Sequence, residues 1–138
     1  MRALGLDLGS KRIGVAVSDL TGTSASPHSV IARSKSTRHD HQVIATLVHD
    51  EEAEIVVVGL PITMAGEHGP AAQAATREAR LLSTVLSVPV EMFDERMTTV
   101  AADRVLREAD IRASDRRRHV DKIAAAVMLQ AWLDRRRS

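Results

Sequence analysis

The 138-residue sequence contains no cysteine and no tyrosine, and only one phenylalanine and one tryptophan. The lack of cysteine excludes disulfides, thiolate zinc sites and cysteine nucleophiles. The scarcity of aromatic residues argues against a protein that stacks single-stranded bases on aromatic side chains. No apolar run approaches the roughly 18 residues of a membrane span, and the N-terminus has no signal-peptide pattern. We therefore expect one soluble, cytoplasmic domain over residues 1–138, without a membrane partner.

The formal net charge is only +1, but the charges are unevenly distributed along the chain. Residues 1–102 hold 9 basic and 12 acidic side chains, whereas residues 103–138 hold 10 basic and 6 acidic ones. Two arginine triplets, 116–118 and 135–137, dominate the second region. They are interpreted either as a solvated helix face with a frayed terminus or as a patch that contacts phosphates.

The hydrophobic pattern predicts a mixed α/β fold. Short apolar or alternating runs predict five strands, at residues 2–8, 12–19, 28–33, 54–61 and 88–95. Helical periodicity and capping residues predict four helices, at about residues 36–52, 70–86, 98–109 and 115–134. Three strands in a meander, followed by alternating helices and strands, give a mixed sheet covered by helices. This order is typical of the ribonuclease H-like architecture.

An acidic residue, Asp7, lies in the middle of the first apolar strand. An isolated carboxylate is very costly there, so Asp7 must be protonated, paired with a cation such as Lys11 or Arg12, or bound to a metal ion. Gly5 and Gly9 flank it, which predicts an open surface that a phosphate or a metal could approach.

Two further acids are candidates for the same site. Glu95 follows the last strand, at the kind of position where ligands gather in open α/β sheets; the alternative is an exposed Glu95 paired with Arg96. Asp121 falls beside the apolar stripe of the last helix, and it could also be a boundary residue favoured by the helix dipole. That stripe consists of Val120, Ile123, Ala124, Val127 and Ala131.

Three semi-buried acids from separate elements make a hard-oxygen site of the kind that binds Mg²⁺ or Mn²⁺. Two such ions can activate water and stabilise the leaving oxygen in phosphodiester cleavage. The sequence has no G-x-S-x-G, H-E-x-x-H or P-loop motif. The cluster "HDH" at residues 39–41 is interpreted as the polar first turn of a helix. The acids therefore favour a metal-dependent nuclease.

Four segments of the chain together resemble the YqgF/RuvX family. They are "GLDLGSKRIGVAVSD" (5–19), "VVVGLPITMAGEHGP" (57–70), "PVEMFDERMTT" (89–99) and "VDKIAAAVMLQAWLD" (120–134). Members of this family are described as pre-16S rRNA nucleases or Holliday junction resolvases. The resemblance covers essentially the whole chain, and it implies a ribonuclease H-like fold with a five-stranded sheet in the order 3-2-1-4-5.

The resemblance also implies roles for individual residues. Asp7, Glu95 and Asp121 would be the catalytic and metal-binding set, holding Mg²⁺ or Mn²⁺. Related resolvases end the fourth strand with a carboxylate, but here that strand reads "IVVVGLP", and residue 124, often a fourth acid, is alanine. Glu95 must therefore reach Asp7 from two strands away, roughly 10 Å between backbones. The candidates for binding nucleic-acid phosphates are Lys11, Arg12, Arg96, Arg116, Arg117 and Arg118.

The function expected from this set is metal-dependent cleavage of structured RNA, in the maturation of the 5′ end of the 16S rRNA precursor, with ribosomal precursor particles as partners. The close alternative is the resolution of four-way DNA junctions, which usually requires a homodimer with two active sites; the sequence leaves monomer and homodimer open. Two other classes stay open as well. They are an actin-like phosphotransferase and a non-catalytic RNA- or polymerase-associated binding protein.

Overall fold

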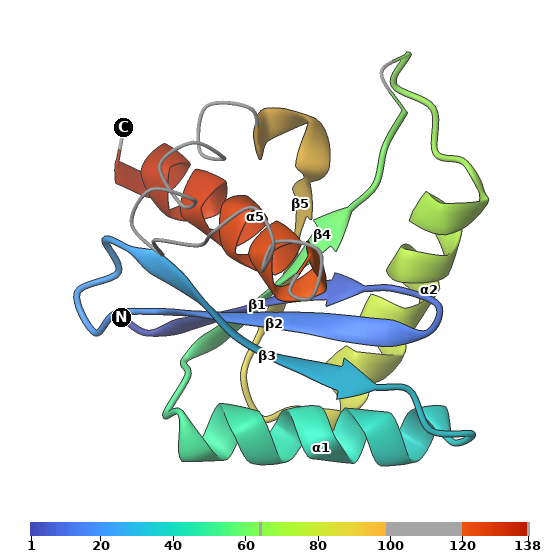
Figure 1. Cartoon of the computed structure of the whole chain (residues 1–138), viewed down its shortest axis with the longest axis horizontal. Helices are drawn as coiled ribbons and strands as arrows, with labels where there is room; N and C mark the ends of the chain where they lie inside the picture. The colour runs from blue at the N-terminus through green and yellow to red at the C-terminus, as the bar shows by residue number, and fades with distance from the viewer. Residues whose placement is uncertain (64, 99–119, 138) are drawn as a thin grey trace.

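Five strands form a single mixed sheet in the computed structural model, which describes residues 1–63, 65–98 and 120–137 (Figure 1). The strands are β1 (Ala3–Leu8), β2 (Arg12–Ser18), β3 (Ala25–Ala32), β4 (Ile55–Leu60) and β5 (Val90–Asp94). Their order is β3-β2-β1-β4-β5, with β1–β2 and β2–β3 antiparallel and β1–β4 and β4–β5 parallel. This confirms the predicted strand order and the predicted hairpin between the first two strands.

Helices cover both faces of this sheet. They are α1 (Thr37–Asp50), α2 (Pro70–Val85), the short 3₁₀ helix η1 (Glu95–Thr98) and α5 (Val120–Arg137). Figure 1 shows α5 crossing one face, while α1 and α2 lie on the opposite face. The "HDH" cluster lies in α1, as predicted. The helix predicted at 98–109 and the triplet Arg116–Arg118 lie outside the described residues, apart from Thr98 at the end of η1.

Strand β3 begins three residues earlier than the sequence predicted, at Ala25 rather than residue 28. Pro27 made the preceding stretch look like a loop. However, β3 is the edge strand, where a proline can face away from the neighbouring strand without removing a ladder hydrogen bond. The register between the two strands shifts here: Val15 of β2 pairs with Ser29 and Ala16 pairs with Pro27, so β3 has one extra residue, His28.

The two faces of the sheet differ in side-chain size. The face toward α1 and α2 carries large residues such as Leu4, Leu6 and Ile13, which are fully buried. The face toward α5 carries small residues, among them Ala3 and Ala16. Because the side chains beneath it are small, α5 packs close to the sheet.

Two glycines make this close packing possible, and one of them corrects a prediction. A Cβ on Gly14 would overlap the carbonyl oxygen of Asp121, and a Cβ on Gly5 would lie 2.9 Å from Cβ of Leu129. The space beside Gly5 is therefore filled by α5, so the expectation of an open surface there was wrong. Glycine at positions 5 and 14 allows α5 to pack directly against the sheet.

Helix α5 is more deeply buried than its predicted stripe. The buried side chains of this helix include Ala125, Met128, Leu129 and Trp132, whereas the predicted stripe residue Ala124 is only partly buried.

In the described part of the chain, no helix has both the length and the apolar character that a membrane span requires.

Replacing Gly14 by alanine should lower the free energy of unfolding by about 3 kcal/mol, because the added methyl group would meet the backbone of α5 rather than a side chain that can move. Denaturant unfolding measures this change. Gly69→Ala is the control, since nothing lies within 4 Å of the added methyl group. Its expected loss is at most about 1 kcal/mol, from the weaker N-cap. Equal losses in the two variants would contradict the packing described here.

Candidate active site

Asp7 lies on the α5 face of β1, between two glycines. It is paired with Gly14 of β2, and the parallel register that pairs Leu6 with Val58 brings it beside Gly59 of β4. Neither neighbour has a side chain, so the backbone of α5 at Asp121 lies over Gly14 and the Glu95 side chain lies over Gly59. No basic side chain in the described part of the chain forms an ion pair with Asp7, so pairing with Lys11 or Arg12 is not how its charge is accommodated.

Glu95 reaches toward Asp7 across β4, because β4 has a glycine at the crossing point. Glu95 follows β5 directly, and Gly59 is paired with Phe93 of that strand. A Cβ added to Gly59 would lie 2.5 Å from Oε1 and 3.1 Å from Cδ of Glu95, so the side chain of Glu95 lies over Gly59. The Glu95 side chain thus crosses β4 toward Asp7 at Gly59, the one position of β4 that has no side chain.

The two carboxyl groups line one cavity. Asp7 and Glu95 contribute its acidic side, and α5 contributes an apolar wall of Ala124, Val127 and Met128, around a volume of about 420 Å³. Burial, followed by the charge of Asp121, raises the pKa of Asp7. Burial, followed by the charges of Asp7 and Asp94, raises the pKa of Glu95 to about 7. The cavity is therefore electrostatically prepared for a cation.

Asp121 lies near Asp7 but points to a different partner. Its negative charge contributes to the raised pKa of Asp7. Its Oδ2 atom, however, accepts a hydrogen bond of 2.9 Å from Nε of Arg12, and it does not line the cavity. The Arg12 side chain is 59% exposed, and ion pairs of this kind contribute about 0–1 kcal/mol. The pair can therefore open at little cost.

The structure thus places Glu95 and Asp121 near Asp7, but the three carboxylates do not form one set of metal ligands. Within residues 1–63, 65–98 and 120–137, no three histidine, aspartate or glutamate side chains are close enough to hold one metal ion as they stand. The available donors are carboxylate oxygens, which suit Mg²⁺ or Mn²⁺. Joint coordination by Asp7, Glu95 and Asp121 stays a prediction, and it requires Asp121 to leave Arg12.

The predicted phosphate-binding residues have different environments. Arg96 donates to both carboxylate oxygens of Asp94, at distances of 2.6–3.1 Å, and Arg12 is paired with Asp121. Lys11 is exposed in the turn between β1 and β2 and forms no ion pair with the described residues. Lys11 is thus the one described member of the predicted set whose charge is not already paired.

Gly59 is the site residue that the sequence analysis missed. The signal was present, because a glycine interrupts the β-branched run "IVVVGL" of a buried strand, and such glycines often mark close approach by another group. What the sequence did not show is which group approaches.

Residues 1–135 of the chain match the family model described as "RuvX: Holliday junction resolvase". A Chloroflexus aggregans protein named "Putative pre-16S rRNA nuclease" is 47% identical over 135 residues, which cover 98% of this chain and 94% of that protein. A Myxococcus xanthus protein of the same name is 46% identical over 137 residues, covering 99% and 90%.

Two solved structures resemble the fold. The structure "T. thermophilus RuvC in complex with Holliday junction substrate" has a TM-score of 0.66 at 18% identity, covering 99% of this chain and 96% of that one. The fowlpox virus Holliday junction resolvase has a TM-score of 0.56 at 13% identity, covering 98% and 99%. At these identities the likeness shows the fold alone, which is ribonuclease H-like, as the strand order predicted.

Glu95→Gln should stabilise the metal-free protein at pH 8 but not at pH 4. The folded state raises the pKa of Glu95 from 4.5 to about 7, so the folded state binds more protons than the unfolded state between these values. Stability therefore falls as pH rises through this window, and the glutamine variant avoids the loss. After allowance for solvent screening, the gain at pH 8 is on the order of 1 kcal/mol. Unfolding in the presence of a chelator measures it, and a gain of equal size at both pH values would contradict the assignment.

Proposed function

The chain belongs to the RuvX family, and we propose that it is a metal-dependent endonuclease that hydrolyses phosphodiester bonds in structured RNA, in the maturation of the 5′ end of the 16S rRNA precursor. Similarity over nearly the full length to proteins named as pre-16S rRNA nucleases supports this substrate. The activity belongs in the cytoplasm, on ribosomal precursor particles or on the isolated precursor.

One observation carries the proposed chemistry. Asp7 lies in β1 and Glu95 directly follows β5, with β4 between these strands, yet both acids line one cavity because Gly59 lets the Glu95 side chain cross. Burial and the charge of Asp121 raise the pKa of Asp7. Burial and the charges of Asp7 and Asp94 raise the pKa of Glu95, so the site opposes ionisation of both groups. Separating the two carboxyl groups would make the folded protein more stable. A cation bound between them would instead neutralise their charges.

The residues of the chain have separate tasks in this scheme. Asp7 and Glu95 would hold a divalent cation through carboxylate oxygens, and Asp121 would join them after leaving Arg12. A bound Mg²⁺ or Mn²⁺ supplies the positive charge that activates water and stabilises the leaving oxygen. The apolar wall formed by α5 lowers the local dielectric and so strengthens these charge interactions.

Arg12 has a second task once Asp121 has turned toward the cation. Its guanidinium group then lies beside the catalytic cavity with its donors available, and a substrate phosphate is a suitable acceptor. The same exposed ion pair would thus hold Asp121 before the substrate binds and supply a phosphate contact afterwards.

Resolution of four-way DNA junctions is the second candidate. The description of the matching family and the fold shared with a junction-bound resolvase favour it. This activity requires two active sites on a symmetric dimer, cutting opposed strands. Cleavage of a four-way junction by a dimer, without cleavage of a 16S precursor leader tested beside it, would select this candidate.

The purified protein with Mg²⁺ or Mn²⁺ should cleave a 16S precursor leader, and Asp7→Asn should reduce the rate by at least about 1,000-fold, because the central acidic oxygen donor is lost. Gel-resolved cleavage of end-labelled RNA measures both rates. Thermal unfolding of the variant checks that it folds. Cleavage by folded Asp7→Asn at the wild-type rate would remove Asp7 from the site.

The Gly59→Ala variant should lose cleavage activity while losing little stability. The added methyl group meets the end of the flexible Glu95 side chain, so the stability loss should stay below about 1.5 kcal/mol. The displaced carboxylate should nevertheless reduce the cleavage rate by about 100-fold, as expected for a misplacement of about 1 Å. Gly69→Ala, whose methyl group enters open space, is the control and should cleave normally. A Gly59→Ala protein with wild-type activity would show that Glu95 does not act from over β4.

A further inference from the structure

The beginning of α1 carries cations where the helix dipole disfavours them. Lys35 precedes the helix and Arg38 lies in its first turn, and both are exposed. Neither forms an ion pair with any of the described residues. The one acid of that turn, Asp40, is buried and accepts a hydrogen bond of 3.0 Å from the backbone N–H of Ser34. Two exposed positive charges therefore remain at the positive end of a helix, an unfavourable placement.

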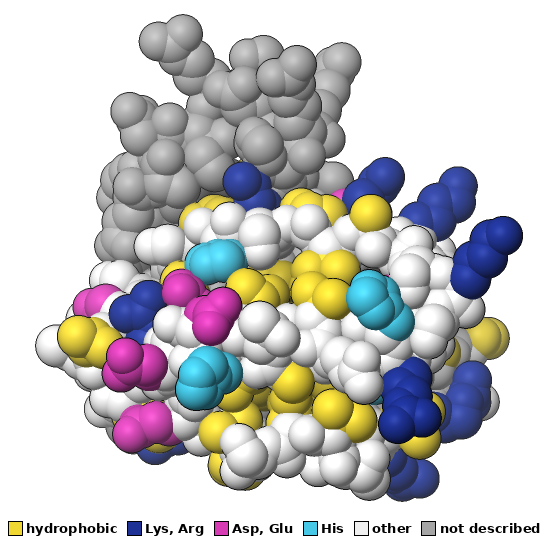
Figure 2. Space-filling view, turned by 90° about the horizontal axis from the view of Figure 1, so that it is seen from below, with side chains coloured by type: hydrophobic (Ala, Val, Ile, Leu, Met, Phe, Trp, Pro, Cys, Tyr) yellow, Lys and Arg dark blue, Asp and Glu magenta, His cyan; other side chains and the backbone are white. Residues whose placement is uncertain are grey.

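The other end of α1 has the opposite charge, which is also unfavourable to the dipole. Four acids close together in the sequence lie at or just beyond this end: Asp50, Glu51, Glu52 and Glu54. Of these, Glu51 contacts Arg2 and His28. Figure 2 shows the consequence on the face seen from below, where most lysine and arginine side chains lie toward the right and the aspartate and glutamate side chains gather toward the left. The charge of this face is thus polarised along α1, against the intrinsic dipole of that helix.

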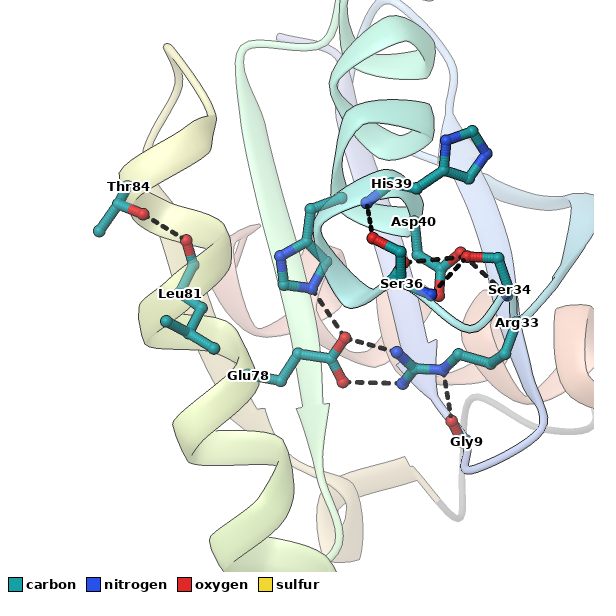
Figure 3. Close-up of polar contacts among 10 residues, drawn as sticks. Gly9, Arg33, Ser34, Ser36, His39, Asp40, Glu78, Leu81 and Thr84 are labelled. Carbon is teal, nitrogen blue, oxygen red and sulfur yellow. Dashed lines mark hydrogen bonds and ion pairs between the residues drawn. The ribbon is translucent and has the colours of Figure 1, made fainter.

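A half-buried polar network joins the start of α1 to the turn that follows Asp7 (Figure 3). Arg33 donates to both carboxylate oxygens of Glu78, at 2.6 and 2.7 Å, and its Nε donates to the carbonyl oxygen of Gly9 at 3.0 Å. The ring of His41 contacts the same carboxylate at 2.8 Å. The backbone N–H of Arg33 also donates to the carbonyl oxygen of Lys11. The network therefore holds Lys11 beside the segment that leads to Lys35.

This network pairs the negative charge of Glu78 with the positive charge of Arg33, so neither group is left to pair with its exposed neighbours. Glu78 and Asp40 are the acids closest to the network, and both are engaged inside the protein. Lys11, Lys35 and Arg38 are left at the surface, and we call these three residues the basic edge. It begins at Lys11, in the turn that follows the strand bearing Asp7, and continues to the first turn of α1.

We propose that the basic edge binds the phosphate backbone of the nucleic-acid substrate, beyond the bond that is cleaved. This inference rests on the proposed function. Charges placed against a local stability rule, with their neighbouring acids turned inward, are expected where a ligand compensates for them. The scarcity of aromatic residues favours phosphate contacts over base stacking. The acidic far end of α1 would repel the backbone and so orient it along this edge.

The test compares two double variants that each remove two exposed positive charges. Lys35→Gln/Arg38→Gln changes the basic edge, and Arg77→Gln/Arg80→Gln changes α2, where both arginines are exposed and lack ion pairs with the described residues. Binding to a fluorescent 16S precursor leader is measured by anisotropy in an Asp7→Asn background, so that no cleavage occurs. Cleavage is measured separately in the proteins that retain Asp7.

The Lys35→Gln/Arg38→Gln variant should bind about 10-fold more weakly at 0.1 M salt. Its slope of log K against log salt should be less steep by about 1–2, because one or two phosphate contacts are lost. In cleavage, KM should rise while kcat changes little. Its unfolding midpoint should stay equal or rise, because cations leave the positive end of a helix. The α2 variant should bind within twofold of the parent.

The outcomes separate this inference from the proposed function. A protein that binds the RNA through the edge but cleaves nothing with Mg²⁺ or Mn²⁺ would overturn the proposed function alone. Unchanged affinity and salt slope in the edge variant, with normal cleavage, would overturn the inference alone, and the edge would then face another partner, such as an acidic protein. Equal losses in both double variants, or a fall in the unfolding midpoint of the edge variant, would also overturn it.

Discussion

The close contact between α5 and the sheet is the constraint on which the rest of the site depends. The helix backbone can lie against β2 only because Gly14 has no side chain. That contact covers Asp7 and places Asp121 near it, and Ala124, Val127 and Met128 of the same helix supply the apolar wall of the cavity. A second glycine, Gly59, performs the corresponding task for Glu95 from the other side. Asp7 and Glu95 line one cavity because β4 has no side chain at Gly59, and Asp121 lies near Asp7 because β2 has none at Gly14.

Two parts of the molecule carry charges that its own stability does not favour. Around Asp7 and Glu95, burial together with the charges of neighbouring acids raises the pKa of both groups. Along α1, exposed charges oppose the helix dipole at both ends. Stability given up in this way is typical of functional sites. The two regions are joined by Arg33, whose contact with Gly9 fixes the turn after the strand that bears Asp7.

Alternation and turn residues predicted the strands and the first hairpin, because these are local signals, whereas the strand order was implied by the family resemblance; the structure confirms both. The shared role of the three acids stays a prediction. The sequence did not predict how Glu95 crosses β4, since the role of Gly59 appears only when strand register is known. It also placed the stripe of α5 too narrowly: the helix is buried on several sides, which weakens the periodic signal. The pairing of Arg12 with Asp121 joins residues far apart in the chain, so no sequence spacing could reveal it.

The central claim is that Asp7, Glu95 and Asp121 share one divalent cation after Asp121 leaves Arg12. A crystal structure of the wild-type protein grown with Mn²⁺, with the ion located by its anomalous scattering, tests this most directly. The account predicts an ion bonded to a carboxylate oxygen of each of the three acids, with Arg12 turned away from Asp121. An ion bound to Asp7 and Glu95 while Asp121 stays paired with Arg12, or no ion in the cavity at saturating Mn²⁺, would contradict it.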